Sequence, residues 1–228
     1  MIAPRGLAAV LILVALLVAP PAAAEDARTW TSTDAYTSTE PWWDLQLEER
    51  IGIGNAQSAI FSSTGSVTVG VGVATALHVD HHWLFGAVLA FDFFAAPPTV
   101  TDAYASVDTT VTPLDTTLAV RIGYLPLALS WMTLGIVVEA GLLIDSTTVT
   151  SGGSDASGVA ALGAFSGTVQ LSFFPFDALE LGVRAGYRYL VGERTTLATT
   201  DAASLHVPKG PFRQNGDVMV TIYEALHF

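Results

Sequence analysis

The segment SVTVGVGVATALHV, residues 66–79, alternates strictly between two kinds of side chain. The odd-numbered positions carry the larger groups, Val67, Val69, Val71, Val73, Thr75, Leu77 and Val79. The even-numbered positions between them carry Thr68, Gly70, Gly72, Ala74, Ala76 and His78. Successive side chains of a strand point to opposite faces, so this period of two predicts a β-strand with one bulky, apolar face. A helix would spread both sets around its circumference.

The same alternation recurs along the chain and predicts eight strands. They are expected at residues 44–54, 66–79, 83–93, 114–124, 134–144, 164–173, 179–189 and 217–228. The connections alternate between short turns and long segments, with the long ones expected at 55–65, 95–112, 145–161 and 191–216. Short periplasmic turns and longer external loops are typical of transmembrane barrels. The sequence therefore predicts an all-β fold, an eight-stranded antiparallel up-and-down transmembrane β-barrel.

The composition limits the class of protein further. Hydrophobic residues make up 51% of the chain and charged residues 13%, but no stretch beyond the N-terminus approaches the roughly 18 apolar residues of a membrane helix. The formal net charge of -12 argues against a nucleic-acid partner, because phosphate binding rests on a basic surface. The absence of cysteine excludes a lipid-anchored cysteine, disulfides and thiolate chemistry.

The N-terminus has the layout of a secretory signal. Arg5 precedes an apolar run over residues 7–18, and the small residues 22–24 follow two prolines. We expect residues 1–24 to be a cleavable signal peptide, 25–42 a polar periplasmic lead and 43–228 the barrel. A retained single-span anchor is the alternative, although about twelve apolar residues are few for a bilayer. The expected location is the outer membrane of a Gram-negative bacterium.

Charged residues fall on the face opposite the bulky groups. The predicted inward set is Glu48, Arg50, Asp92, Asp115, Arg121, Glu139, Glu180, Arg184 and Arg188. Five acids and four arginines are close to neutrality, and we expect them to form a paired network inside the barrel. The alternative is an ion pathway or small-ligand conduit through a charged lumen. A soluble ligand-carrying barrel would place its bulky apolar residues inside instead.

Aromatic residues gather at the predicted strand ends, as expected where strands cross the membrane interfaces. The predicted periplasmic girdle consists of Trp43, Trp83, Tyr124, Trp131, Phe173 and Phe228. Phe91, Phe93, Tyr187 and Tyr189 fall at the outer ends.

Residues that could perform chemistry form no specific pattern. His78, Asp80, His81 and His82 could in principle meet one metal ion, but neighbouring side chains in a tight turn diverge, so no metal and no cofactor is expected. His206 and His227 add no spacing pattern. Ser204 and His206 are a very weak signal for a nucleophile and base. We expect a protein that is not an enzyme, with a lipid-modifying outer-membrane enzyme as a less favoured alternative.

The mature chain resembles the small outer-membrane barrels of the OmpA-like transmembrane and OmpX groups, through its eight strands, its alternating connections and its terminal Phe228. The resemblance implies outer-membrane lipid and lipopolysaccharide as surroundings, and recognition of the last strand by the barrel-assembly machinery. The positions that match that signal are Val218, Val220, Ile222, Leu226 and Phe228. Glu224 departs from it, and Glu49 departs in the same way from the first strand. Each either sits in the membrane interface or is turned inward by a bulge, so the register of these two strands stays open.

These barrels do structural, adhesive, channel and enzymatic work, so the resemblance is one of architecture. A non-enzymatic barrel whose external loops serve structural, adhesive or binding roles is the leading hypothesis, and a narrow, porin-like pore is the alternative. The external ligand of the loops stays unassigned.

Overall fold

The computed structural model describes residues 41–54, 66–79, 82–96, 109–129, 131–151, 154–176, 178–192 and 216–228. It consists of eight strands in one closed barrel, which confirms the predicted fold class. The strands are β1 (Trp42–Gly54), β2 (Ser66–Val79), β3 (Trp83–Ala96), β4 (Thr109–Leu129), β5 (Met132–Ser151), β6 (Ser154–Phe176), β7 (Leu179–Val191) and β8 (Gly216–His227). The predicted signal and most of the lead segment lie outside these residues. Within them, no helix is long and apolar enough to span a membrane.

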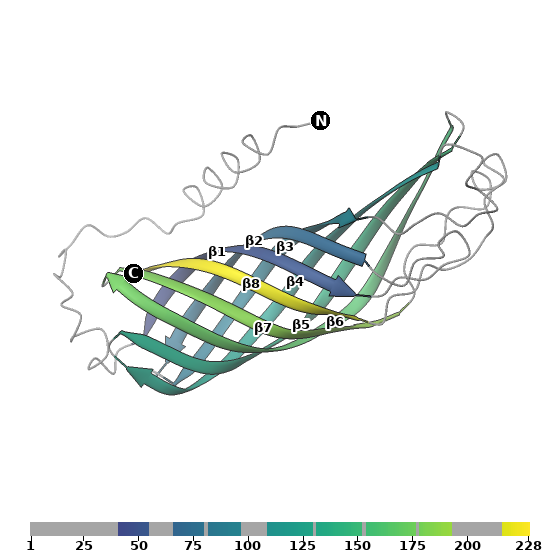
Figure 1. Cartoon of the computed structure of the whole chain (residues 1–228). Helices are drawn as coiled ribbons and strands as arrows, with labels where there is room; N and C mark the ends of the chain where they lie inside the picture. The colour runs from purple at the N-terminus through teal and green to yellow at the C-terminus, as the bar shows by residue number, and fades with distance from the viewer. Residues whose placement is uncertain are drawn as a thin grey trace.

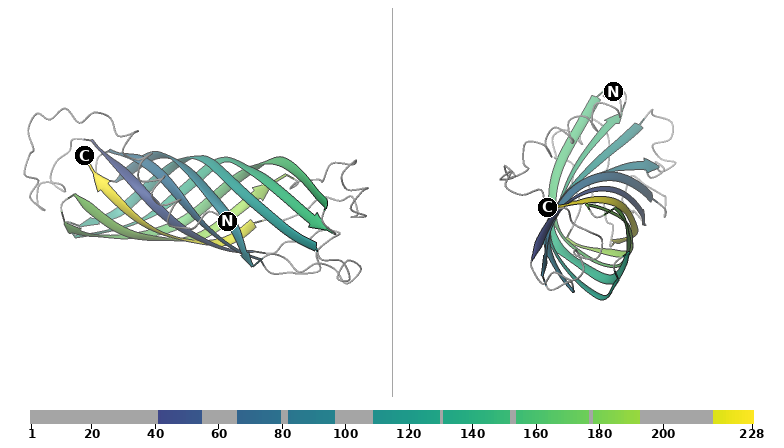
Figure 2. Two further views of the ribbon diagram at one scale, coloured as in Figure 1. Left: turned by 90° about the horizontal axis from the view of Figure 1, so that it is seen from above. Right: turned by 90° about the vertical axis from the view of Figure 1, so that its left-hand side faces the viewer.

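Every strand pairs antiparallel with its neighbours in the chain, and β8 pairs antiparallel with β1 to close the sheet. Figures 1 and 2 show the strands tilted around a common axis, with the C-terminus at the end that carries the turns joining β4 to β5 and β6 to β7. Main-chain hydrogen bonds between Trp43 and Phe228 fasten the seam at that end, with N–O distances of 2.9 and 3.4 Å. Closure leaves no strand edge whose amide groups would meet lipid without a partner.

The two faces of the sheet have opposite chemistry. Large apolar side chains such as Leu118, Val169 and Ile222 are more than half exposed on the outside. The inward positions of the same strands carry buried charged and polar groups. A soluble barrel would have the reverse arrangement, so this polarity excludes the soluble, ligand-carrying alternative.

Two of the predicted long connections are wrong, because strand structure continues into them. The expected connection at 145–161 is instead the end of β5 and the start of β6, which pair residue by residue up to Ser151 and Ser154. Residues 109–112 of the expected connection at 95–112 likewise belong to β4. The apolar alternation ends near Ile144, but the Thr- and Ser-rich chain beyond it keeps a good β propensity. The loss of hydrophobicity therefore marks the edge of the apolar belt and not the end of the strands.

The positions of Glu49 and Glu224 follow from the register at the seam. β1 and β8 pair without irregularity from Asp44–His227 to Gly54–Asp217. Both carboxylates are exposed on the outer face, and no bulge turns either of them inward. β1 begins at Trp42, one residue before the predicted start of the barrel.

Candidate functional site: the ionised lumen

The lumen is filled by polar side chains stacked in three layers. The structure places all nine of the predicted charged residues inside, eight of them buried and Glu139 with a side chain 9% exposed. A central layer is built around Arg121 and Arg184, an outer layer around Arg188, and a third layer lies at the end that carries the short turns.

Arg121 connects three strands in the central layer. Its guanidinium donates to Glu139 from Nε at 2.8 Å and from Nη2 at 2.5 Å. Nη2 also donates to Glu48 Oε1 at 2.6 Å, and Nη1 donates to Gln46 Oε1 at 2.8 Å. Because Arg121 is buried and shares its donors between two carboxylates, it satisfies charges that would be costly to bury alone.

Arg184 enters the same layer from β7. It donates from Nη1 to Glu48 Oε1 at 2.7 Å, from Nε to Gln170 Oε1 at 2.9 Å, and from Nη2 to Gln46. Its Cζ also lies 4.1 Å from the centroid of the Tyr223 ring, a cation–π geometry. Glu48 therefore lies between two guanidinium groups, and the side chains cross the full width of the lumen.

The outer layer centres on a bidentate pair. Arg188 donates from Nε and Nη2 to the two oxygens of Asp217 at 2.9 and 2.7 Å, and from Nη1 to Asp92 at 2.7 Å. Arg50 lies beside this pair, with Nε 3.6 Å from Asp92 and Nη2 3.1 Å from the sulfur of Met219. Two parallel hydrogen bonds give the Arg188–Asp217 contact geometric specificity as well as charge.

The third layer contains no arginine. His78 Nε2 lies 2.8 Å from Asp44 Oδ2, and His227 Nε2 lies 3.1 Å from Glu180 Oε2. Tyr223 donates its hydroxyl to Glu180 Oε1 at 2.6 Å. This layer joins residues from opposite ends of the barrel sequence, and the spacing arguments from the sequence did not detect it.

The prediction of a nearly neutral lumen needs correction. Three further carboxylates, Asp44, Asp145 and Asp217, are buried inside as well. The described part of the lumen therefore holds eight carboxylates against four arginines. Asp44 and Asp217 continue the inward alternation of β1 and β8, a signal that could have identified them. Asp145 lies in a segment that the sequence predicts as a connection, where no inward face is expected.

Two observations indicate close packing among the described side chains of the lumen. The cavity beside Arg50, Thr117 and Glu139 has a volume of about 10 Å³, which is about the space of one water molecule. Gly182 shows how tightly the lumen is filled, because a Cβ atom at this position would collide with the Tyr223 ring.

The outer surface carries the six residues predicted for the aromatic girdle, all of them exposed. The Trp83 and Tyr124 rings lie 4.9 Å apart, and the Trp131 and Phe173 rings 6.2 Å apart. These pairs lie at the same end of the barrel as the short turns. His82 lies beside them on the outside, where its Nδ1 is 2.8 Å from the carbonyl of Leu125. Asp80, His81, Ser204 and His206 lie outside the described residues.

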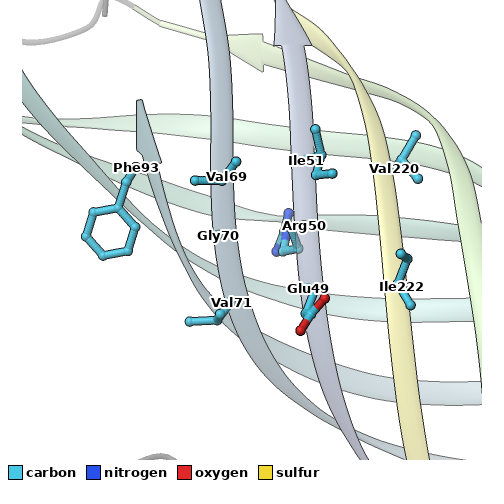
Figure 3. A pocket seen from close by; sticks show the side chains of 9 residues that line it. All are labelled: Glu49, Arg50, Ile51, Val69, Gly70, Val71, Phe93, Val220 and Ile222. Atoms are coloured by element: carbon cyan, nitrogen blue, oxygen red, sulfur yellow. The ribbon is translucent and has the colours of Figure 1, made fainter. Parts of the chain in front are cut away.

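A shallow groove of about 360 Å³ crosses the outer face over β1, β2, β3 and β8. Its apolar wall includes Val69, Phe93 and Ile222, and Glu49 is the one acidic side chain that lines it (Figure 3). Gly70 also lines the groove, and a Cβ atom there would collide with Asp92 inside the barrel. Glu49 thus exposes a carboxylate midway along β1, on a face that is mostly apolar.

Replacing Glu49 with leucine is expected to stabilise the barrel by about 1–2 kcal/mol, because an acidic group facing lipid away from the interfaces is unfavourable. Urea unfolding of the protein refolded in lipid bilayers measures the change. Glu224→Leu, close to the C-terminal end of β8, is the matched control and should give a smaller gain. Equal or lower stability of Glu49→Leu would show that this carboxylate has a favourable partner on the outer face.

The closed sheet, the apolar exterior and the ionised interior together define a class of protein. A bilayer accommodates an apolar belt of this kind, and barrels with these faces span the bacterial outer membrane. The chain is therefore a small transmembrane β-barrel of the outer-membrane type.

Comparison with known proteins agrees at the level of the fold. The chain is similar to a solved major outer membrane protein from Thermus thermophilus, with a TM-score of 0.58 and 10% identity over 82% of this chain and 99% of that one. A weaker similarity is to neisserial surface protein A, with a TM-score of 0.49 and 12% identity over 79% of this chain and 95% of that one. Another is to OprG from Pseudomonas aeruginosa, with a TM-score of 0.48 and 11% identity over 85% of this chain and 98% of that one. No protein-family model and no curated relative matches the sequence.

Proposed function

We propose that this protein is a non-enzymatic outer-membrane barrel whose rigid, filled body supports external segments with structural, adhesive or binding roles. The observation that carries the proposal is the central layer, in which Arg121, Arg184 and their partners occupy the cross-section of the lumen. Breaking these buried charge pairs to let ions pass would be strongly unfavourable. The filled lumen thus favours this role over a narrow pore.

Three strands, β4, β5 and β6, are much longer than the others, and their length supports a role outside the membrane. β4, β5 and β6 contain 21, 20 and 23 residues, compared with 13 in β1, and they project beyond the other strands in Figure 1. At about 3.3 Å per residue, the strand beyond Ile144 adds roughly 20 Å to β5. Most of its residues are Ser or Thr. A paired, polar ribbon of this length is a stiff support on which binding groups can be presented outside the bilayer.

We also infer that the surroundings of the barrel are outer-membrane lipid and lipopolysaccharide, and that the assembly machinery recognises the last strand. Ile222, Leu226 and Phe228 are exposed on the outer face of the sheet, and Val220 lies on the same face. Their alternation supports that recognition. Secretion through a cleaved signal at residues 1–24 remains a prediction.

Conductance in planar bilayers tests the proposal against a pore. The wild-type protein, inserted and verified by the mobility shift between boiled and unboiled samples in detergent gels, should give no steady single-channel steps. A porin reconstituted in the same bilayers is the positive control. Steady steps that change in size or disappear in Arg184→Ala or Glu139→Ala would contradict the proposal and favour the conduit.

A further inference from the structure

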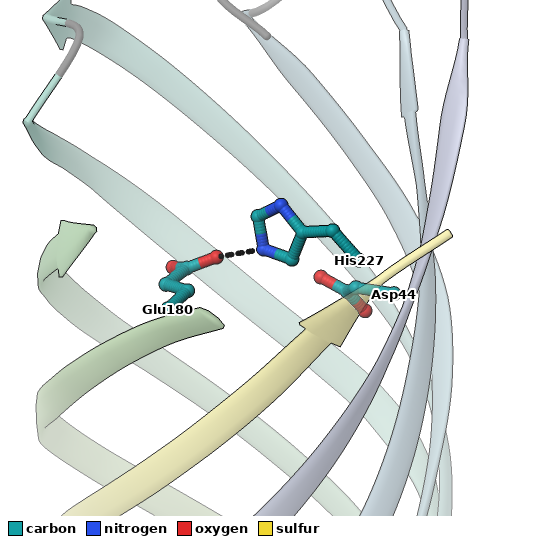
Figure 4. Close-up of side chains that lie close together, drawn as sticks. All are labelled: Asp44, Glu180 and His227. Atoms are coloured by element: carbon teal, nitrogen blue, oxygen red, sulfur yellow. Dashed lines mark hydrogen bonds and ion pairs between the residues drawn. The ribbon is translucent and has the colours of Figure 1, made fainter. Parts of the chain in front are cut away.

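We propose that Asp44, Glu180 and His227 form a binding site for a divalent transition metal ion such as Zn²⁺ at the periplasmic end of the lumen. Their potential ligand atoms all lie within 4.8 Å of one another. Figure 4 shows the three side chains converging from β1, β7 and β8. A mixed set of carboxylate and imidazole ligands suits Zn²⁺ better than Mg²⁺ or Ca²⁺, which prefer oxygen alone.

The positions of the three ligands follow from closure of the barrel. Asp44 and His227 are register partners across the seam between β1 and β8, and Glu180 lies on β7, the next strand. All three are therefore held on rigid strands. Zinc ligands at about 2.0–2.2 Å from the ion lie about 3.3–3.6 Å from one another in tetrahedral geometry. The ligand atoms of Asp44, Glu180 and His227 lie within 4.8 Å of one another, so only small movements of the side-chain ends would bring them to these distances.

A buried carboxylate oxygen without a hydrogen-bond partner is a second, independent observation in favour of a cation at this place. Asp44 is 2% exposed, and its Oδ2 accepts a hydrogen bond from Gln46 at 2.9 Å and faces His78 at 2.8 Å. Its other oxygen, Oδ1, is equally buried and has no hydrogen-bond partner among the described residues. A buried carboxylate oxygen without a partner is unfavourable, and a metal ion would satisfy it.

The charge of the layer leads to the same conclusion. Two buried carboxylates, Asp44 and Glu180, lie close together here without the guanidinium groups that pair with carboxylates in the other two layers. A divalent cation would balance both charges. It would replace the proton that now lies between His227 Nε2 and Glu180 Oε2, since a metal-bound imidazole nitrogen cannot carry a proton.

The neighbours of the three ligands are arranged like the supporting groups of known metal sites. His78 holds Asp44 through Oδ2, and Tyr223 holds Glu180 through Oε1, which leaves the opposite oxygens for the ion. The Trp42 ring stacks on His78 at 4.7 Å and lies 6.5 Å from His227. These aromatic rings limit the access of water. The His227 side chain is 11% exposed, so the site keeps some contact with solvent at this end of the barrel.

Titration of the folded, untagged, chelator-treated protein with Zn²⁺ by calorimetry tests the site. We expect one ion per chain in a saturable event. Asp44→Asn, which preserves the shape of the side chain, and His227→Ala should each weaken binding at least about 100-fold, because loss of a supporting group alone weakens a metal site by about 10–100-fold. The gel mobility shift shows whether each variant is folded. If His227→Ala does not fold, Asp44→Asn alone tests the site.

His82→Ala is the matched control, because His82 lies on the outer surface near the same end of the barrel. It should bind Zn²⁺ as the wild type does. Absence of saturable binding to the wild type, unchanged affinity in Asp44→Asn, or loss of binding in His82→Ala would each overturn the proposal. The first two results would identify the layer as a network of hydrogen bonds alone. None of these outcomes bears on whether the lumen conducts.

Discussion

Arg121→Met is expected to lower the free energy of unfolding by about 3–5 kcal/mol, the usual effect of removing one partner of a buried ion pair. Methionine has a similar length but no donors. Glu48 would keep its contact with Arg184 at 2.7 Å, whereas Glu139 would retain a single described hydrogen bond, from Ser166 at 3.1 Å. The loss of stability therefore arises mainly from the Glu139 carboxylate, which loses its charged partner. Urea unfolding of the protein in bilayers, followed by tryptophan fluorescence, measures it.

A second substitution separates the effect of an unpaired buried carboxylate from the effect of lost side-chain packing. In the double variant Arg121→Met/Glu139→Gln, the carboxylate is neutral and more than half of the lost stability should return. Glu139→Gln alone should destabilise the barrel less than Arg121→Met, because Arg121 would still donate to Glu48 at 2.6 Å. A double variant no more stable than Arg121→Met would refute the ionic explanation and indicate that the guanidinium acts by filling space.

Tyr223→Ala should lower the free energy of unfolding by about 3–5 kcal/mol, the range for deleting a large buried aromatic side chain. Tyr223 is 1% exposed and is among the largest fully buried side chains of the described residues. Its ring packs over Gly182 and under the Arg184 guanidinium, and its hydroxyl donates to Glu180. The same unfolding experiment applies.

Tyr223→Phe distinguishes the ring from its hydroxyl. This variant keeps the packing and the cation–π contact but leaves Glu180 Oε1 without its donor at 2.6 Å, so a loss of about 1–3 kcal/mol is expected. Gly182→Ala should also destabilise the wild type, because the new methyl group collides with the ring, and it should be tolerated better beside Tyr223→Ala. Equal losses for the Ala and Phe variants at Tyr223 would show that the hydroxyl carries the whole effect.

The division between inner and outer faces was predictable because it depends only on the parity of each residue within its strand. Arg184 and Leu181 could be assigned to opposite faces without knowledge of any contact. The pairing of Arg121 with Glu139 was also predictable from the sequence, because the two residues are register partners in the hairpin of β4 and β5. The ends of β5 and β6 could not be predicted in the same way. The apolar alternation reports the hydrophobicity of the surroundings and not the hydrogen bonding of the backbone.

Contacts across the barrel could not be predicted in this way. Arg188 meets Asp92 at 2.7 Å although β7 and β3 are not neighbours in the sheet. His78 and His227 appeared unrelated in the sequence, but their rings lie 6.2 Å apart. Their proximity depends on the number of strands, the tilt of the strands and the register of the seam, which together set the width of the lumen.

The order of residues along the chain thus settled which side chains face lipid and which face the interior, because alternation is a local property of each strand. The identity of the partners inside, and the cluster of Asp44, Glu180 and His227, arose only when β8 closed against β1. Closure is a global event that brings distant strands to one axis, and no local pattern in the chain records the distances that result.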